Sequence, residues 1–241
     1  MNDRLTTTMV GEIVATDFRA AAVFEQFGID FCCGGRRDLD DACRTAAADP
    51  ADVVRALEAL SPVADHESGV TQWRLDRFID HIVSTHHAYV RSSMPTIGRH
   101  LTKLVEVHGA RHPELARVAA CFGTVIRDLG HHLLKEEQVL FPYVRELAMT
   151  TASGRHVRSP FGTVKNPIRM MEREHREAAD ELRIIRELTH GYVASDDGCT
   201  TYAVCMAELD RFERDLHRHV HLENNVLFPK AVELENGYQA S

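Results

Sequence analysis

The sequence predicts an all-α protein in which a small helical N-terminal domain precedes an up-down-up-down four-helix bundle. Three observations favour this fold class: four long stretches with apolar residues at helical spacing, a repeated segment, and a turn signal about midway along each repeat. We therefore expect a cysteine-bearing domain over residues 1–60, a linker over residues 61–71 and the bundle over residues 72–237.

Composition supports a folded chain and excludes several classes of protein. The 241 residues are 44% hydrophobic and 27% charged, which provides for a packed core. The formal charge of -8 argues against a nucleic-acid binder, which needs a basic surface. Long apolar runs are missing, so we expect neither a membrane span nor a signal peptide. Six cysteines in a chain of this length predict no disulfide framework and hence a cytoplasmic location.

The first 60 residues contain two short helical patterns around a cysteine pair. Residues 16–17 open the first pattern, and Gly28 closes it as the glycine that follows a helix end. Asp49 caps the second pattern, with Pro50 at its first position, and the pattern runs to Leu60. Both predict short helices.

Two of the long stretches carry a stripe with alternating steps of four and three residues, which is typical of a helix face in a bundle core. In each stripe, His and Glu replace two central apolar residues. The first stripe is Val118, Phe122, Val125, Leu129, His132, Glu136, Val139 and Tyr143. The second is Cys205, Leu209, Phe212, Leu216, His219, Glu223 and Val226. A third stretch gives Ile168, Met171, His175, Ala178, Leu182 and Ile185. The first long stretch is less regular, and we expect Pro95 to kink it.

The two halves of the bundle repeat each other. The segments HLLKEEQVLFP and HVHLENNVLFP begin at His132 and His219, which are 87 residues apart. The upstream histidines, His87 and His175, are 88 residues apart. Because the arms on either side of each turn signal are nearly equal in length, both histidines of a hairpin should lie at one height. A duplicated helical hairpin explains these offsets.

This arrangement predicts a metal centre. Residues four apart on a helix share a face, so each His-x3-Glu pair points an imidazole and a carboxylate at one region. Two buried carboxylates need a counter-charge, which a pair of metal ions with neutral imidazole ligands supplies. A His and carboxylate set with open positions favours non-haem iron over structural zinc. The predicted ligands are His87, His132, Glu136, His175, His219 and Glu223.

Several neighbours leave alternatives open. His86 adjoins His87, either face of that helix is compatible with the site, and only the repeat offset favours His87. Glu137 and Glu174 could relay protons or bind metal transiently, but a solvated helix face is the simpler interpretation. Three further histidines fall off the core stripes and are expected at the edge of the bundle: His131, His217 and His221.

Cys32 and Cys33 are adjacent, which strains a disulfide between them, because their α-carbons are about 3.8 Å apart and disulfides usually need about 4.4–6.8 Å. The two glycines and two arginines of residues 34–37 predict an exposed, flexible loop in which the arginines favour thiolate. We interpret the pair as a metal, nitrosyl or redox relay to the bundle rather than an incidental turn. The other cysteines have separate predictions: assistance to the pair for Cys43, the core for Cys121 and Cys205, and a turn for Cys199.

The motif GIDFCCGG at residues 28–35, the bundle that follows it and the two His-x3-Glu…Val-Leu-Phe-Pro segments together resemble the iron–sulfur cluster repair di-iron (RIC) family. The resemblance covers nearly the whole chain and implies a cysteine-bearing domain joined to a hemerythrin-like bundle. It implies two non-haem irons bridged by carboxylates and an oxo group. The family's ligands match His87, His132, Glu136, His175, His219 and Glu223, with both Glu as bridges, and its cysteine pair matches Cys32 and Cys33. One departure is His86, which stands where the family has a tyrosine.

The resemblance also implies a function. It points to a cytoplasmic homodimer that helps to restore iron–sulfur proteins damaged by nitric oxide or oxidants, by donating or relaying iron. Nitric oxide and oxygen are the implied small ligands, and neither nucleic acid nor a membrane is an expected partner. Two alternatives stay open: a nitric oxide or oxygen trap or sensor, and an enzyme that reduces nitric oxide at the paired irons.

Overall fold

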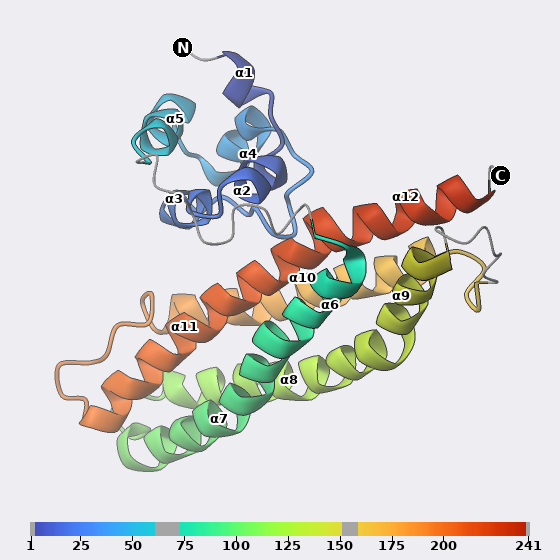
Figure 1. Ribbon diagram of the computed structural model, residues 1–241. Helices are drawn as coiled ribbons and strands as arrows, with labels where there is room; N and C mark the ends of the chain where they lie inside the picture. Colours follow the sequence, from blue (N-terminus) through green and yellow to red (C-terminus); the bar gives the residue numbers. More distant parts are fainter. Residues whose placement is uncertain (1–2, 61–72, 151–158, 240–241) are drawn as a thin grey trace.

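The computed structural model describes residues 3–60, 73–150 and 159–239, and these residues form helices and no strand. The predicted all-α bundle is confirmed. Figure 1 shows four long helical rods side by side, with a group of short helices resting on one side of them. The predicted linker, residues 61–71, lies outside the described residues.

Each rod of the bundle is a long helix or a chain of helical segments joined end to end. The first rod consists of α6 (Leu75–His81), η2 (Ile82–His87) and α7 (Ala88–His108). The second consists of α8 (Glu114–Lys135), η3 (Glu136–Leu140) and α9 (Phe141–Thr150). The third is α10 (Lys165–Leu188). The fourth consists of α11 (Thr200–Leu222), η4 (Glu223–Leu227) and α12 (Phe228–Gln239). Helix α7 packs against α8 and α11, and α10 packs against the same two helices, so the rods form a closed ring of neighbours.

Three rods contain a π-helical turn, labelled η2, η3 and η4. Such a turn holds one more residue than an α-helical turn and frequently marks a functional site. In two rods it ends directly before the Phe-Pro step at Pro142 or Pro229, where the missing N–H removes a helix hydrogen bond. Pro95, where a kink is predicted, lies inside α7, and the π turn of that rod is η2.

The π turns explain the one error in the predicted core stripes. Val139 was expected in the core, but its side chain is 48% exposed. The extra residue in η3 shifts the register, so that Leu140 faces inward in place of Val139, while Tyr143 is buried as predicted. All residues of the stripe on α10 are buried as predicted.

The N-terminal segment consists of five short helices within the described residues, of which α3 and α5 lie at the predicted signals and α1 and α2 were not predicted. They are α1 (Asp3–Thr6), α2 (Val10–Thr16), α3 (Ala20–Gln26), α4 (Leu39–Ala46) and α5 (Pro50–Glu58). Gly28 follows α3 with a φ of +67°, which glycine adopts readily. The Asp49 carboxylate accepts a hydrogen bond from the N–H of Ala51 and caps α5. Helix α4, which was not predicted, has the same kind of cap at Asp38.

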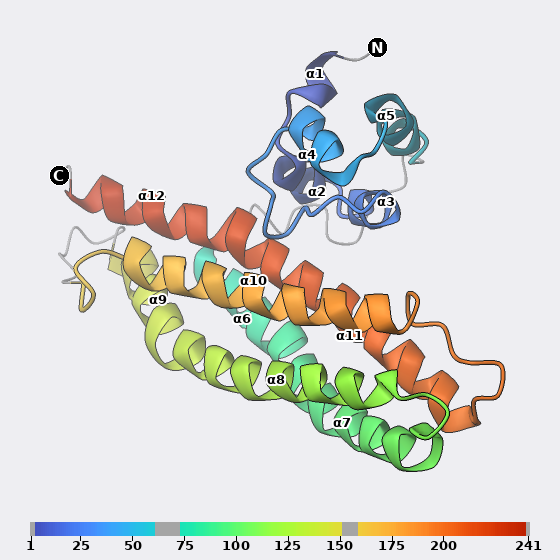
Figure 2. The same cartoon turned by 180° about the vertical axis from the view of Figure 1, so that it is seen from behind.

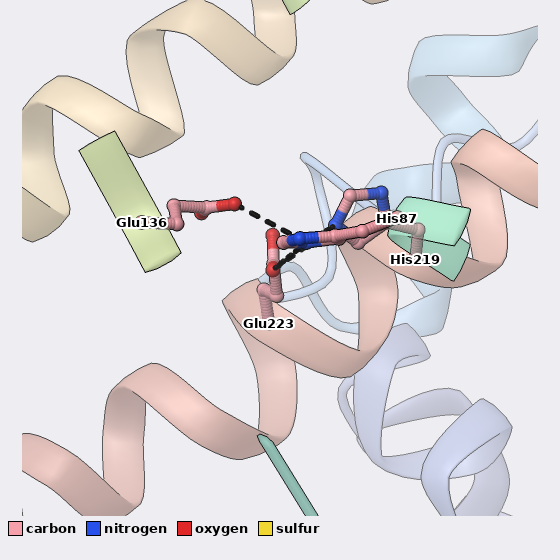
Figure 3. A group of neighbouring side chains, drawn as sticks. All are labelled: His87, Glu136, His219 and Glu223. Carbon is pink, nitrogen blue, oxygen red and sulfur yellow. Dashed lines mark hydrogen bonds and ion pairs between the residues drawn. The ribbon is translucent and has the colours of Figure 1, made fainter. Parts of the chain in front are cut away.

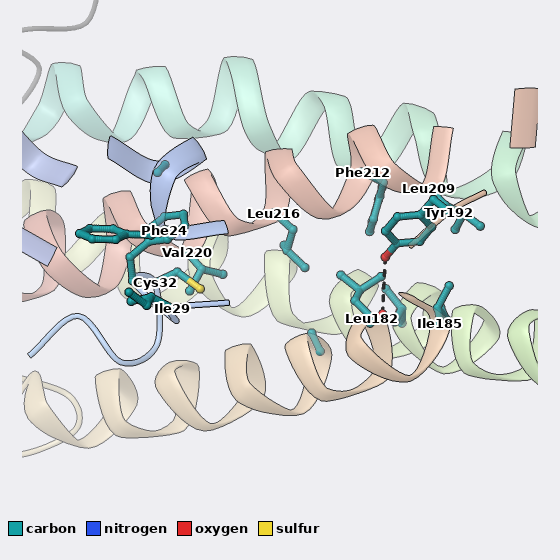
Figure 4. Packing of buried hydrophobic residues seen from close by; sticks show 14 of the residues in the cluster. Phe24, Ile29, Cys32, Leu182, Ile185, Tyr192, Leu209, Phe212, Leu216 and Val220 are labelled. Carbon is teal, nitrogen blue, oxygen red and sulfur yellow. Dashed lines mark hydrogen bonds between the residues drawn. The ribbon is translucent and has the colours of Figure 1, made fainter. Parts of the chain in front are cut away.

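The apolar core forms two clusters, one on each side of a polar layer. The larger cluster joins the N-terminal helices to the turn-side half of the bundle, and Figure 4 shows Ile29 and Cys32 of that segment with Val220 of α11. The smaller cluster surrounds Phe78, Leu140 and Phe228, the last of which begins α12. Figure 2 shows the N-terminal helices against the face that contains α10 and the fourth rod. They therefore cover the bundle at the height of the polar layer.

Candidate metal centre

Six buried polar side chains make up the layer between the two apolar clusters. Each of the four rods supplies one histidine, and the first residues of η3 and η4 supply the two glutamates. None is more than 1% exposed: His87, His132, Glu136, His175, His219 and Glu223. The structure thus brings together all six residues that the sequence singles out. Three of them lie at the end or the start of a π turn, which sets the direction of their side chains.

These side chains form two groups of four that share both carboxylates. His87 and His219 lie with Glu136 and Glu223, and the ligand atoms of this group are within 4.8 Å of one another. Figure 3 shows the two carboxylates of this group reaching the two rings from different helices. The second group joins His132 and His175 to the same glutamates. Two metal positions bridged by two carboxylates are the arrangement that such sharing can provide, with one pair of imidazoles at each position.

The donor atoms are crowded in a way that fits a cation. The Nε2 atoms of His87 and His219 are 3.1 Å apart, and those of His132 and His175 are 3.0 Å apart. Two nitrogens this close can share at most one proton. Without a cation, the remaining lone pairs of these rings and of the carboxylates therefore lie close together. Both carboxylate oxygens of Glu136 are buried without a hydrogen-bond partner. Buried carboxyl oxygens without a hydrogen-bond partner are costly, and a cation beside them removes that cost.

The charges within the layer respond to this crowding. Burial alone would lower the pKa of His132, but the carboxylates of Glu136 and Glu174 raise it to about 10. Burial alone would raise the pKa of Glu223, but the imidazoles of His219 and His175 hold it well below its usual range. Protons on the rings thus supply part of the positive charge that metal ions would bring.

The outer nitrogens of three rings are held by side chains next to predicted ligands. The Nδ1 atoms of His87 and His132 lie 2.7 Å and 2.9 Å from carboxylate oxygens of Glu137 and Glu174. Glu137 and Glu174 were expected on a solvated face, and that expectation is wrong. A carboxylate or carbonyl on the far nitrogen orients a ligating imidazole. Their position directly beside Glu136 and His175 in the sequence was the available signal.

Asn224 holds the third ring and was not predicted to have a role. Its Oδ1 lies 3.0 Å from Nδ1 of His175. It directly follows Glu223, as Glu137 directly follows Glu136, so the repeat itself carried the signal. Within the described part of the chain, Nδ1 of His219 has no hydrogen-bond partner.

The choice between His86 and His87 depends on η2. Both rings are buried, because the π turn directs two successive side chains inward. His87 lies in the group with the glutamates, whereas Nδ1 of His86 lies 3.0 Å from Asp215. The His86 ring is stacked on that of His219, with ring centroids 5.8 Å apart. His86 therefore supports a ring of the group from outside it.

The cysteine loop differs from its prediction. Cys32 is buried and only Cys33 is half-exposed, so the loop is not the exposed one that was expected. Its hydrogen bond with Cys33, together with burial, raises the pKa of the Cys32 thiol well above its usual range. The expected thiolate at Cys32 is therefore wrong. The nearby arginines bind elsewhere, since Arg36 pairs with Glu172 of the bundle and Arg37 with Thr45.

The loop is buried because it docks on the fourth rod. His221 was expected at the bundle edge, but it is 1% exposed and packs against Phe18 and Phe31. His217 is half-buried and pairs with Glu25, also of the N-terminal segment. The carboxylate of Asp30 lies within 4.8 Å of both thiols, so these three residues form a further group able to hold a metal ion.

The remaining cysteines lie mostly in the core. Cys121 and Cys205 are buried there as predicted. Cys43 is also fully buried, and burial raises the pKa of its thiol. Cys199 is exposed in the turn before α11, as predicted, with its Sγ 3.3 Å from Nε2 of His108.

A cavity of about 400 Å³ opens beside the second group of ligands, between α8 and α10. Its lining includes His132 itself, together with Glu174, Lys135 and the exposed His131. Three more carboxylates line it: Asp128, Glu177 and Glu181. The His132 side chain therefore contributes both to the buried group of ligands and to the wall of this acidic cavity. Within the described ranges, no helix is both long and apolar enough to cross a membrane.

Comparisons with known proteins agree with this architecture. Residues 78–231 match the family described as "Hemerythrin HHE cation binding domain", and residues 6–61 match a "Domain of Unknown function (DUF542)". The chain is 34% identical over 223 residues to the "Iron-sulfur cluster repair protein YtfE" of Dickeya chrysanthemi, covering 92% of this chain and 96% of the relative. It is 33% identical to the protein of the same name from Escherichia coli O157:H7 over 227 residues, with the same coverage. A "Probable iron-sulfur cluster repair protein" of Haemophilus influenzae is 31% identical over 215 residues, covering 88% of this chain and 91% of the relative.

Proposed function

This chain belongs to the family of iron–sulfur cluster repair proteins with a hemerythrin domain, and on that premise we propose that it restores damaged iron–sulfur proteins by delivering iron. The iron comes from a pair of non-haem ions held inside the bundle. Glu136 and Glu223 would be ligands of both ions, with His87 and His219 on one of them and His132 and His175 on the other, because the two groups share both carboxylates.

One observation carries the proposal: the two groups of four ligands share both carboxylates. Imidazole and carboxylate ligands without thiolate suit iron, and they leave positions on each ion open to exchange. Bound ferrous iron supplies both a transferable ion and a binding position for small ligands. The chain's own residues fix the rings through Glu137, Glu174 and Asn224, and they keep the carboxylates away from water.

The thiol pair completes the route in this proposal. Asp30, Cys32 and Cys33 can hold an ion on the side of the bundle where the N-terminal helices dock. The buried neutral thiol of Cys32 gives up its proton when a cation binds, since the thiolate is the metal ligand. Cys33, which is half-exposed, then presents the ion towards a client protein.

The first test is a metal count on protein purified without chelator. We expect two iron ions per chain, and fewer than one in the double variant Glu136→Gln/Glu223→Gln, which keeps the shape of the site but removes both charges. Glu177→Gln is a matched control, because Glu177 is exposed on α10 and pairs with Arg173 rather than with a ring. Wild-type protein without stoichiometric iron would overturn the metal centre.

The second test measures repair. A cluster enzyme damaged by nitric oxide is mixed with the iron-loaded protein, and recovery is compared with that given by the same concentration of free ferrous iron. We expect faster recovery with the protein, and a loss of the difference in Cys32→Ser/Cys33→Ser. Equal recovery with free iron would contradict delivery by this protein while leaving the metal centre intact.

A second function is favoured by the apolar rings that cover the ligands. Phe141 is stacked on His87, with centroids 5.7 Å apart, and Phe228 is stacked on His175 at 6.2 Å. Ferrous positions under such rings suit small apolar gases, so we propose binding of nitric oxide or oxygen as the alternative. Stoichiometric nitric oxide binding without cluster recovery would favour a trap or sensor, and repeated production of nitrous oxide would favour a reductase.

Three further predictions accompany this proposal. The division into a cysteine-bearing domain over residues 1–60 and a bundle over residues 72–237 predicts that the bundle alone retains iron. The homodimer is tested by sedimentation equilibrium of the full chain. The cytoplasmic location is tested by fractionation of the host cell.

A further inference from the structure

The two repeats of the bundle differ at the position that follows each shared glutamate. The first repeat has Glu137 there and the second has Asn224. Both side chains contact a histidine in the same way, since each places an oxygen near Nδ1 of the ring. The ring is that of His87 for Glu137 and that of His175 for Asn224. Support of the histidine ring therefore does not explain why the second repeat has a carboxamide where the first has a carboxylate.

The explanation lies in the donor that only asparagine has. The Nδ2 atom of Asn224 donates a hydrogen bond to the carbonyl oxygen of Cys32, at 3.2 Å. A carboxylate in this place would meet the carbonyl oxygen with a second acceptor and repel it. Asn224 is 6% exposed, so water does not relieve that conflict. The side chain is thus a single bridge between a predicted iron ligand and the cysteine loop.

The Asn224 bridge also determines that Nδ1 of the His175 ring carries a hydrogen. A carbonyl oxygen only accepts hydrogen bonds, so the NH₂ group must face Cys32 and Oδ1 must face His175. Nδ1 of the ring then carries the hydrogen. In the neutral ring, Nε2 then keeps its lone pair on the side of the glutamates, where it lies 3.1 Å from Glu223. This tautomer is the one that binds a metal through Nε2.

The neighbouring Asn225 docks the same loop without contacting a ligand of the group. Its Nδ2 donates to the carbonyl oxygens of Phe31 and Cys32, at 3.1 Å and 3.2 Å. A Cβ atom added at Gly35 would lie 2.4 Å from its Oδ1, which shows how closely the loop is seated. Asn225 thus offers a control for docking alone.

We propose that Asn224 is a positioning residue that couples metal binding at His175 to the docking of the Cys32-Cys33 loop. A metal on Nε2 fixes the ring and strengthens Nδ1–H as a donor, which orders the carboxamide and with it the Cys32 carbonyl. By linkage, a docked loop increases the affinity of the site for metal by the same factor. The inference rests on the metal centre proposed above and not on repair activity.

Hydrogen exchange of the peptide that spans residues 29–37 tests the coupling in the full chain. We compare anaerobic protein loaded with ferrous iron with metal-free protein. Loading should slow exchange of this peptide by about fivefold, the change that one hydrogen bond of ordinary strength makes to an opening equilibrium. Iron is counted in the same samples, so a chain that binds no iron reveals failure of the metal centre rather than of the coupling.

Two isosteric variants separate coupling from docking. Asn224→Asp still accepts from His175 but repels the Cys32 carbonyl, so we expect it to bind iron with no effect of loading on exchange. Asn225→Asp should exchange faster in both states and keep the wild-type ratio. If the Asn224→Asp chain does not fold by circular dichroism, Asn224→Ser, which is too short to bridge, replaces it. A wild-type ratio in the Asn224 variant would overturn the proposal, as would a wild-type chain in which loading leaves exchange unchanged.

Discussion

Glu174 lies on the far side of the His132 ring from the metal centre, with Oε2 2.9 Å from Nδ1 of that ring. Its other oxygen is bound by the ammonium group of Lys135. The hydrogen bond from His132 is the main reason why the pKa of Glu174 falls to about 2, with Lys135 contributing against the effect of burial. A carboxyl group with a depressed pKa stays ionised as pH falls until that value is approached, so Glu174 is an anion throughout the physiological range.

We therefore predict that Glu174→Gln weakens iron binding about tenfold, the lower end of the effect usual for a residue that orients a metal-ligating histidine. The amide still accepts a hydrogen bond but no longer increases the basicity of the ring. Competition with a ferrous chelator measures the change. Glu177→Gln, on the same cavity wall but without a ring partner, should leave the affinity within twofold. Equal affinities for the two variants would show that Glu174 does not support His132.

The presence of six polar side chains in one layer could be predicted because it depends only on the spacing of these residues along the helices. Residues 132 and 136, like 219 and 223, share a helix face, and the repeat places the upstream histidines at the same height. The pairing of His87 with His219, and of His132 with His175, could not be obtained in this way. It depends on how each helix is rotated about its own axis, which the sum of all packing contacts decides.

The exposure of single residues was less predictable, for two physical reasons. Val139 points outward because η3 adds a residue to its turn, and a helical pattern assumes a constant period. Cys32 is buried by a contact with Asn224 that is distant in the sequence, so local composition suggested an open loop. The arginines after it were expected to stabilise thiolate, but Arg36 has Glu172 as its partner.

Because the cysteine loop is docked on the bundle, we predict that Gly35→Ala destabilises this docked arrangement, although Gly35 lies in a loop. The new methyl group would lie 2.4 Å from the side chain of Asn225, which cannot move without breaking its bonds to Phe31 and Cys32. Overpacking of this kind typically costs about 1–3 kcal/mol. We expect faster alkylation of Cys32 and, at saturating ferrous iron, an unchanged iron count.

Gly123→Ala is the control for that variant, because a Cβ atom on Gly123 meets nothing within 4 Å. Gly123 lies inside α8, so alanine there should stabilise the helix by about 0.5–1 kcal/mol. Chemical denaturation followed by circular dichroism measures this gain. A loop that remains protected from alkylation in Gly35→Ala would contradict the docked geometry.

Cys199 should be the most reactive thiol at neutral pH. The hydrogen bond from His108, supported by backbone N–H groups at the start of α11, lowers its pKa to about 7. The thiolate is the reactive form, so the rate of alkylation by iodoacetamide should rise with pH and reach half its maximum near pH 7. The four buried cysteines, by contrast, are shielded from the reagent. Peptide mapping identifies the labelled residue.

The contribution of His108 to this reactivity is tested by His108→Phe, which keeps a ring against Tyr202 but removes the nitrogen that contacts the thiol. The half-maximum should move upward by at least one pH unit. His100→Phe is the control, since His100 lies on the same helix and pairs with Glu208 instead. A profile that stays at pH 7 in His108→Phe would show that the helix start alone activates the thiol.

Outside the metal centre, we expect replacement of Glu235 to have the largest effect on the free energy of unfolding. This carboxylate is 4% exposed and accepts hydrogen bonds from three groups: the Tyr143 hydroxyl at 2.9 Å, the Thr163 hydroxyl at 2.5 Å and the N–H of Val164 at 2.8 Å. It thus joins α12 to α9 and to the beginning of α10, where a negative charge also interacts favourably with the helix dipole.

Glu235→Ala leaves those donors buried without an acceptor, and each unsatisfied group costs about 1–3 kcal/mol. We expect the free energy of unfolding to fall by about 3 kcal/mol, measured with urea, and by about 1 kcal/mol in Glu235→Gln, which retains one acceptor oxygen. Glu233→Ala, exposed on the same helix, should change stability by less than about 0.5 kcal/mol. Iron content should be unchanged in all three variants, because the predicted ligands lie in the layer beyond this cluster. A loss in Glu235→Ala no larger than that in Glu233→Ala would mean that water satisfies the three donors, and that the end of the bundle is open where the structure has it closed.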